Sequence, residues 1–211
     1  MNGMLRKDLL ILRSNGKAYG GMVLLYAVIA VIGNTSLFSC MTAVLLLVLP
    51  INSFAADEQA RWDQFAAALP GGRRAVVRGR YQFLLIVAAG TVLLSGVVAL
   101  VTIALGRGGG LTPGELAMTA LSCTAVGLLA NALFFPFLFK YGTQKARICL
   151  AIGFGVIFAV LGIGATLVGD VAGVLSALPT AAFAGAAVVL LIAVLVGSYC
   201  ISCRVYDRKE F

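Results

Sequence analysis

Five long stretches without a charged residue constrain this chain more than any other feature of its sequence. They cover residues 18–56, 81–106, 116–139, 148–169 and 171–203, and together they contain 144 of the 211 residues. A helix crosses the hydrocarbon of a bilayer with about 20 apolar residues, so each stretch is long enough for a crossing. Only 11% of the residues are charged, whereas a soluble domain carries about 25%. The sequence therefore predicts an all-α, polytopic membrane protein.

The first and the last stretch have to be divided. Residues 33–36 (Gly-Asn-Thr-Ser) form a turn-favouring cluster inside the first stretch, and residues 169–179 contain the Gly, Ser and Pro of a connector. The predicted spans are residues 18–32, 36–54, 81–105, 115–139, 148–168 and 180–201. The first is short, so its helix is expected either to begin before Ala18 or to tilt little. Six transmembrane helices leave hardly any residues for a soluble domain, and residues 1–211 are expected to form one transmembrane domain.

Basic residues fix the predicted orientation of these spans. With six crossings, 15 of the 16 Lys and Arg residues lie on one side, and only Arg107 lies opposite. Because Lys and Arg accumulate on the cytoplasmic side, both termini are predicted to be cytoplasmic, in a multi-pass protein of the plasma membrane. The net charge of +8 is then explained by topology and by contact with anionic lipid headgroups, without a nucleic-acid partner.

Several kinds of chemistry are excluded by absent residues. The chain has no histidine, which removes His-dependent triads and His-ligated metals, and it has no GxxxxGK[ST] loop for nucleotide phosphates. Cys200 and Cys203 form a CxxC, but the other zinc ligands are missing, so they are interpreted as small residues at a helix end. No catalytic residue, cofactor or metal is expected, and any ATP and Mg²⁺ must be bound by another chain.

The spans contain no charged residue in their central parts, only isolated polar ones. These are Thr42, Asn52, Ser53 and Asn131, and each is predicted to form a hydrogen bond between helices. A face of small residues in the fifth span is predicted to allow close helix packing, with a helix of the same chain or of a second copy. Its members are Ala151, Gly155, Ala159 and Gly162.

The most informative polar segment is residues 55–80. Trp62, Phe65 and Leu69 lie on one face of a predicted amphipathic helix, and Asp57 and Arg61 have the spacing of an i,i+4 pair. Pro70 and two glycines break this helix, and a second short helix, residues 73–80, is expected to lead into the third span. This unit either lies in the headgroup layer or docks in a groove of a partner protein.

The N-terminal residues 4–15 are also amphipathic, with Leu5, Leu9 and Leu12 on one face. For this segment we expect a helix that lies in the membrane interface.

Three segments together resemble a known family. MNGMLRKDLLILRSNGK at the start, LPGGRRAVVRGRY (residues 69–81) in the loop and SYCISCRVYDRKEF at the end are similar to type 2 ABC-transporter permeases of the small six-span kind. In the loop, Arg78 and Arg80 flank the position where a lysine is usual. The short outer loops look similar to those of the permeases of bacterial exporters of amphipathic peptides, such as phenol-soluble modulins.

This resemblance implies that two permeases pair around a central pathway, in contact with membrane lipids, and that each is bound to a cytoplasmic ABC ATPase subunit. A homodimer is expected, and a heterodimer is the alternative. The resemblance also implies that residues 55–80 form the coupling loop. The motif positions that carry over are Leu69, Pro70, Arg73, Val76 and Tyr81. Trp62, Phe65 and Leu69 are then expected to enter a groove of the ATPase, with Arg73 and Arg74 facing acidic residues at its rim.

The predicted function is that of the permease subunit of an ATP-driven exporter, which is not itself an enzyme. Spans with few polar groups suit a hydrophobic or amphipathic substrate, and a peptide is expected from the resemblance. An alternative is a membrane protein of the immunity or lipid-binding kind that has no ATPase partner. A self-contained secondary carrier is the least favoured, because such carriers use intramembrane charges that these spans lack.

Overall fold

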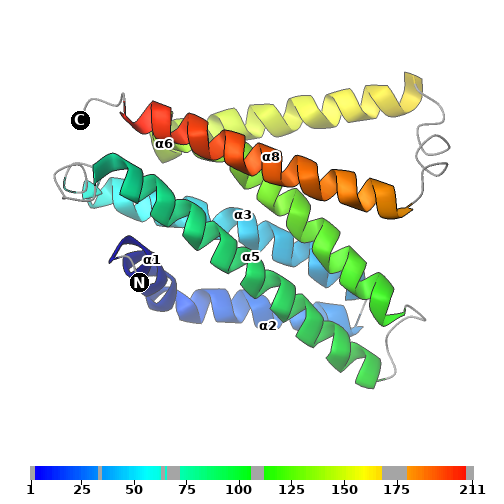
Figure 1. Ribbon diagram of the computed structural model, residues 1–211. Helices are drawn as coiled ribbons and strands as arrows, with labels where there is room; N and C mark the ends of the chain where they lie inside the picture. Colours follow the sequence, from blue (N-terminus) through cyan, green and yellow to red (C-terminus); the bar gives the residue numbers. More distant parts are fainter. Residues whose placement is uncertain are drawn as a thin grey trace.

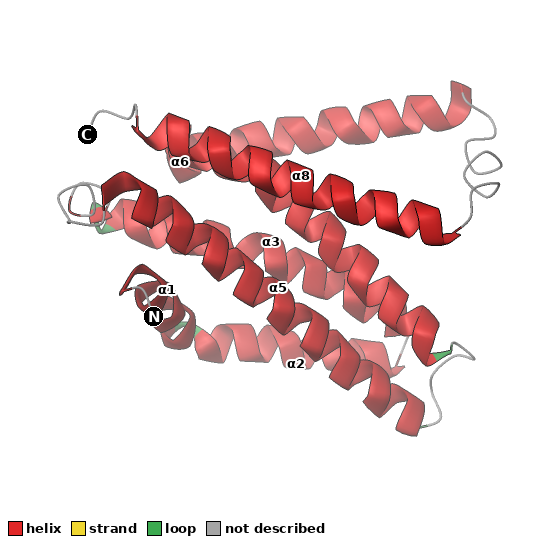
Figure 2. Cartoon of the chain, in the orientation of Figure 1, coloured by secondary structure: helices red, strands yellow, loops and turns green. Residues whose placement is uncertain are grey.

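The computed structural model describes residues 3–32, 35–62, 65, 72–105, 112–167 and 180–207, and the side chains of residues 149–184 lie outside the described part. Within these ranges the secondary structure is α-helical, with no strand (Figure 2). The helices are α1 (Gly3–Ser14), α2 (Gly16–Ile32), α3 (Thr35–Gln59), α5 (Gly72–Ala104), α6 (Pro113–Leu167) and α8 (Thr180–Asp207).

Four helical stretches of the described chain are long and apolar enough to cross a membrane. They are Met41–Gln59, Arg74–Ala104, Gly114–Thr143 and Gly185–Asp207. The protein is therefore an all-α, multi-pass membrane protein, and the predicted fold class is confirmed. A shorter apolar helix, Gly16–Ile29, stands at the first predicted span and begins before Ala18, which is one of the two expected alternatives. That this helix and residues 148–168 complete a set of six crossings stays a prediction.

Helix α6 contains the fourth and the fifth predicted span. The two parts meet at Gly142, whose backbone is not helical (φ 75°, ψ 175°). Figure 1 shows the chain reversing at this point, so that the second part runs back toward the other end of the bundle. A positive φ is accessible to glycine without the penalty that a β-carbon imposes. The predicted spans 115–139 and 148–168 leave residues 140–147 as a loop between them. In the structure these residues are helical on both sides of Gly142, and the chain reverses at that glycine.

Helices α3 and α5 extend further than their predicted spans. Helix α3 continues to Gln59, so residues 55–59 belong to the second span's helix and do not start a separate one. The expected short helix of residues 73–80 is likewise wrong, because these residues are the first turns of the 33-residue helix α5. A helix of that length is about 50 Å long and extends well beyond the hydrocarbon of a bilayer.

One end of the bundle gathers most of the polar features of the chain. Helix α1, the end of α3, the start of α5, the reversal in α6 and the end of α8 all lie there (Figure 1). We call it the basic end, since it carries the exposed Arg13, Arg74, Arg78, Lys140 and Arg204.

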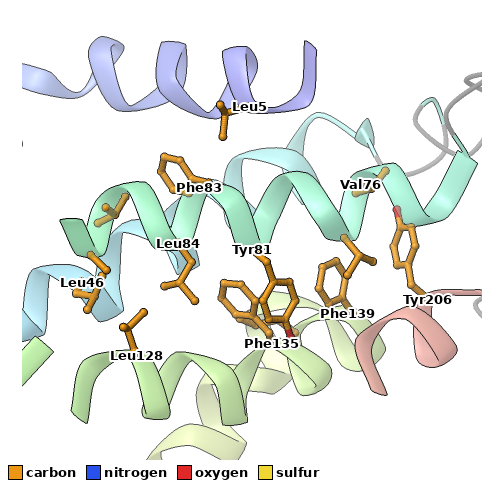
Figure 3. Close-up of a cluster of buried hydrophobic side chains, with 14 residues drawn as sticks. Leu5, Leu46, Val76, Tyr81, Phe83, Leu84, Leu128, Phe135, Phe139 and Tyr206 are labelled. Atoms are coloured by element: carbon orange, nitrogen blue, oxygen red, sulfur yellow. The ribbon is translucent and has the colours of Figure 1, made fainter. Parts of the chain in front are cut away.

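An aromatic core holds the helices together at the basic end. The ring of Tyr81 lies 5.0 Å from that of Phe135, and the ring of Phe139 lies 5.3 Å from that of Tyr206. Figure 3 shows these four side chains between α5, α6 and α8. Such edge-to-face ring pairs add to the stabilisation that burial alone gives.

The apolar face of α1 packs on the bundle. Leu5 is buried and faces Phe83 of α5 (Figure 3), while Leu9 and Leu12 lie against the same core. This face therefore packs on protein, and the expected position of the helix in the membrane interface stays a prediction. The apolar side chains of α1 pack against the other helices, and Asp8 on the same helix forms a buried ion pair that is described below.

The isolated polar residues of the spans form hydrogen bonds between helices, as predicted. The hydroxyl oxygens of Thr42 and Ser95 are 3.2 Å apart, Asn52 Nδ2 donates to the Tyr19 hydroxyl at 3.1 Å, and Asn131 Nδ2 donates to the carbonyl oxygen of Leu46 at 3.1 Å. The contact made by Ser53 belongs to the site below.

Gly127 marks a close approach of α6 to α3. A β-carbon at this position would meet Cδ2 of Leu46 at 2.9 Å, which is too close without movement. One turn away, Asn131 donates to the carbonyl oxygen of the same Leu46. A glycine and a buried amide thus allow these two helices to pack tightly, as small residues do within membranes.

The N-terminus of α6 is capped by its own sequence. The backbone N–H of Thr112 donates to the Glu115 carboxylate at 2.8 Å, and the backbone N–H of Glu115 donates to Thr112 Oγ1 at 3.4 Å. Pro113 occupies the first helical position, where its missing N–H costs no hydrogen bond. This capping box fixes where α6 begins.

Candidate functional site

A buried cluster of charged residues joins α1, α3 and α5 at the basic end. Arg80 of α5 has a side chain that is only 4% exposed. Its Nη1 donates to Asp8 Oδ1 of α1 at 2.8 Å, and its Nη2 donates to Asp57 of α3. Ser53 Oγ accepts from the same guanidinium and donates to Asp8 Oδ1 at 2.9 Å. Lys7 completes the cluster, with its Nζ 2.5 Å from Asp57 Oδ2.

The electrostatics of the cluster depend on burial as much as on pairing. Burial raises the pKa of the Asp8 carboxyl, and the positive charges of Arg80 and Lys7 oppose this shift. Burial also lowers the pKa of the Lys7 ammonium, helped by repulsion from Arg80 and opposed by Asp57 and Asp8. Each charge is therefore tolerated because of the others, and removing one partner would leave an uncompensated buried charge.

Two sequence interpretations are corrected by this cluster. Arg80 is held inside the protein by two carboxylates and does not face lipid headgroups. Asp57 contacts Lys7 and Arg80, whereas Arg61 lies beyond the end of α3 with a positive φ of 49°. The expected i,i+4 pair of Asp57 and Arg61 would need the helix to continue through Arg61, and it ends at Gln59.

Glu58, the neighbour of Asp57, contacts the reversal in α6. The backbone N–H of Thr143 donates to Glu58 Oε2 at 2.8 Å, and the Thr143 hydroxyl donates to the same oxygen. Thr143 is the first residue after Gly142 and is buried. The carboxylate thereby caps the start of the second part of α6, a position where negative charge is favourable.

Asp57 and Glu58 thus join three other helices to one turn of α3. Asp57 binds α1 and α5, and Glu58 binds α6. We call this pair of residues the anchor turn. In the chain it comes directly before residues 60–71, which are the middle of the predicted coupling loop.

The predicted aromatic contacts of the coupling loop differ in exposure. Trp62 is partly buried against the core, with Lys7 Nζ 4.7 Å from its ring centroid. Its Nε1 is buried and meets no hydrogen-bond partner among the described residues. Phe65 is 58% exposed, and its ring centroid is 5.1 Å from that of Trp62. Of the two rings, Phe65 is therefore the more accessible to a partner.

The remaining predicted coupling residues lie at or near the start of α5. Arg74 is exposed and its Nε is 3.5 Å from Asp207 Oδ2 of α8. Val76 and Tyr81 are buried, and the Tyr81 hydroxyl lies 2.6 Å from Ser198 Oγ and 3.0 Å from Ser202 Oγ. The side chains of Val76 and Tyr81 therefore lie inside the bundle and not on its surface. Leu69 and Pro70 lie outside the described residues, as does the side chain of Arg73.

The predicted face of small residues lies in the second part of α6. Ala151, Gly155, Ala159 and Gly162 all belong to this helix, but their side chains are outside the described part of the structure. Their role in helix packing stays a prediction.

Where the chain is described, two of its cavities lie between the membrane helices. One, of about 290 Å³, lies between α5 and α6 and is lined by Val92, Ser95, Leu116 and Ala120 among others. The other, of about 300 Å³, is lined by Val23, Thr42, Leu45 and Thr91 among others, from α2, α3 and α5. Both are apolar with one or two hydroxyl groups, a lining that suits a hydrophobic or amphipathic molecule.

The roles of Asp8, Glu58 and Arg80 were not predicted from the sequence. A signal for them was available, because acidic residues are rare in the chain (8 against 16 basic ones). Those at positions 57 and 58 lie just after the second predicted span, and Asp8 lies in the amphipathic N-terminal segment. Carboxylates in such places are costly unless paired. The identity of the partners depended on how α1 packs, which no local pattern shows.

Residues 3–207 match the model of a family described as ABC-2 family transporter protein. Comparisons with curated proteins and with solved structures gave no match. The family match covers all the helices described above, including the anchor turn and the buried charged cluster.

Proposed function

Because the chain belongs to the ABC-2 family of transporter proteins, and is thus a membrane permease component of an ABC transporter, we propose that it is the permease of an ATP-driven exporter. The family implies a partner ATPase subunit, and the sequence contains no Walker loop of its own. The membrane helices would provide the pathway, and the partner would hydrolyse ATP.

The observation that carries the coupling proposal is the position of the anchor turn. Residues 60–71 follow it directly, and it binds helices that come before and after it in the chain. We propose that the ATPase binds residues 60–71 through Phe65, supported by Trp62, and that Leu69, Pro70, Arg73 and Arg74 complete the contact. Val76 and Tyr81 would act from inside the bundle, by joining α5 to α6 and α8.

The proposed orientation puts the basic end in the cytoplasm, where an ATPase is found. Basic residues gather at this end, as they do on the cytoplasmic side of membrane proteins. Both termini would then be cytoplasmic. The exposed Arg61 and Arg74, which flank Phe65 in the sequence, would favour an acidic surface on the ATPase and would speed association.

A hydrophobic or amphipathic substrate, such as a peptide, is favoured by the lining of the two cavities. Each has an apolar wall with hydroxyl groups from Ser95 or from Thr42 and Thr91. We further propose that two copies of the chain form the complete pathway, as the resemblance to small permeases implies.

The coupling proposal is tested by replacing Phe65 with Ala in the permease produced together with an ABC ATPase encoded beside it. Phe137→Ala is the matched control, because this phenylalanine is also exposed (48%) but lies in α6. We expect Phe65→Ala to weaken ATPase binding by about tenfold to thirtyfold, since truncating an aromatic anchor costs about 1.4–2 kcal/mol. Co-purification and the stimulation of ATP hydrolysis are the measurements.

Trp62→Ala is a less direct test, because Trp62 also packs against the core and Lys7.

Equal binding and equal hydrolysis in the Phe65→Ala and Phe137→Ala complexes would remove Phe65 from the coupling contact. A permease that binds no ATPase at all would favour the alternative of a membrane protein without an ATPase partner.

A further inference from the structure

The direction of the second part of α6 is set at one residue. Gly142 leaves the helical conformation with a φ of 75°, and helix resumes at Thr143. A single non-helical residue reverses the chain without a loop, so small changes of its backbone angles would swing the whole second part. Some contact outside α6 is needed to hold its direction.

Glu58 of α3 supplies such a contact. Its Oε2 accepts from both the backbone N–H and the hydroxyl of Thr143, at the N-terminus of the second part. The two residues are 85 positions apart in the sequence. The first N–H groups of a helix have no partner within it. A carboxylate here accepts a hydrogen bond from one of them, and its negative charge interacts favourably with the positive end of the helix dipole.

The same carboxylate also fills the space beside Gly142. A β-carbon at Gly142 would lie 2.7 Å from Glu58 Oε1, closer than such atoms approach each other. The glycine is therefore needed twice, for its positive φ and for room to admit the Glu58 side chain. Replacing either Gly142 or Glu58 would therefore disrupt the contact between Glu58 and the start of the second part of α6.

Glu58 lies where movement from a cytoplasmic partner would first reach the bundle. It is in the last turn of α3, one residue before the helix ends at Gln59. Its neighbour Asp57 is fixed to Lys7 and Arg80. A displacement of residues 60–71 that moves this turn is thus delivered to α5 through Asp57 and to the second part of α6 through Glu58.

We propose that Glu58 is a positioning residue that transmits movement of the coupling loop to the second part of α6. This inference rests on the proposed function, because it takes residues 60–71 as the contact with the ATPase. It adds a second route of transmission: the coupling loop moves not only the two helices that it joins in the chain, α3 and α5, but also the helix that follows Gly142.

The first test uses the permease alone in lipid nanodiscs, with spin labels on cysteines that replace the exposed Gln59 and Lys145, in a background without the native cysteines. The unaltered protein should give one narrow distance distribution. Glu58→Ala should lose it, and Glu58→Gln, which still accepts a hydrogen bond, should retain part of it. Glu115→Ala is the control, because Glu115 caps the start of the first part of α6 and not of the second.

Thr143→Val is a milder variant that removes the hydroxyl and leaves the backbone N–H. It keeps the test decisive if Glu58→Ala fails to fold, since partial broadening is expected. A distribution as narrow in Glu58→Ala, or in a folded Thr143→Val, as in the unaltered protein would overturn the proposal.

The second test uses the permease–ATPase complex, with labels at Lys145 and at the exposed Arg204 of α8, with and without ATP and vanadate. We expect a nucleotide-dependent shift that is lost in Glu58→Ala although ATPase binding is retained. An unchanged shift in that variant would overturn the proposed role of Glu58 and would leave the proposed function standing. Failure of the unaltered permease to bind the ATPase would instead contradict the proposed function.

Discussion

At the scale of single residues, Arg80 has the largest consequence for the basic end. Its guanidinium contacts Asp8, Ser53 and Asp57, and its Cζ lies 4.4 Å from the centroid of the Phe54 ring. One side chain therefore satisfies two carboxylates from two different helices. This explains how Asp8, which is 2% exposed, is accommodated beside an apolar core.

We expect Arg80→Gln to destabilise the permease by about 3–5 kcal/mol, because it leaves buried carboxylates without their main counter-charge. Arg78→Gln is the control: Arg78 is exposed, and its replacement should change stability by less than about 0.5 kcal/mol. Unfolding in detergent can be followed through the fluorescence of Trp62, the one tryptophan of the chain.

Adding Asp8→Asn to Arg80→Gln should restore part of the lost stability, because it removes a charge that Arg80 had neutralised. Equal stability of the Arg78→Gln and Arg80→Gln proteins would show that the cluster is solvated, contrary to the burial that we describe.

At the scale of elements, the packing of α6 on α3 depends on Gly127. Its missing side chain leaves room for Leu46, and the Asn131 amide one turn away holds the carbonyl oxygen of that leucine. Hydrogen bonds of this kind are modest within membranes, at about 0.6 kcal/mol on average. Close packing therefore carries much of the stabilisation at this crossing.

Gly127→Ala should destabilise the protein by about 1–3 kcal/mol, because the new methyl group would overlap Cδ2 of Leu46 and force it to move. Gly197→Ala on α8 is the control, since a β-carbon there meets no atom within 4 Å. That variant should be neutral or slightly stabilising, because Ala favours helix more than Gly does. Thermal unfolding of both variants checks this prediction. Equal changes of the unfolding midpoint in Gly127→Ala and Gly197→Ala would contradict it.

At the scale of the whole molecule, the gathering of α1, the reversal of α6 and the end of α8 at one end gives a testable topology. In a background without native cysteines, Lys145→Cys and Thr112→Cys place exposed thiols near opposite ends of the first part of α6. Since the basic end is proposed to be cytoplasmic, a membrane-impermeant maleimide should label Lys145→Cys in inside-out vesicles and Thr112→Cys in intact cells. The reverse labelling pattern would place the anchor turn on the outer side and would contradict coupling to an ATPase.

Much of the fold could be predicted from composition and order along the chain. Most residues of the uncharged runs lie within helices α2, α3, α5, α6 and α8, because an apolar run long enough to cross a bilayer favours a helix. The bounds of the membrane spans themselves stay a prediction. The helix boundaries at the basic end were wrong, because charged residues in 55–59 and 73–80 continue helices that were expected to end. Charge by itself does not stop a helix, whereas the positive φ of Gly142 does.

The sequence by itself determined the class of protein, the arrangement of basic residues at one end and the isolated hydroxyls and amides that join helices. These follow from local physics, in which apolar runs enter lipid and lone polar groups within them seek a partner. Only the tertiary structure decided that Arg80 is paired with Asp8 and Asp57, and that Glu58 reaches Thr143. Such pairings join residues between 23 and 85 positions apart. They depend on which helices lie side by side, and that is settled by the packing of all of them together.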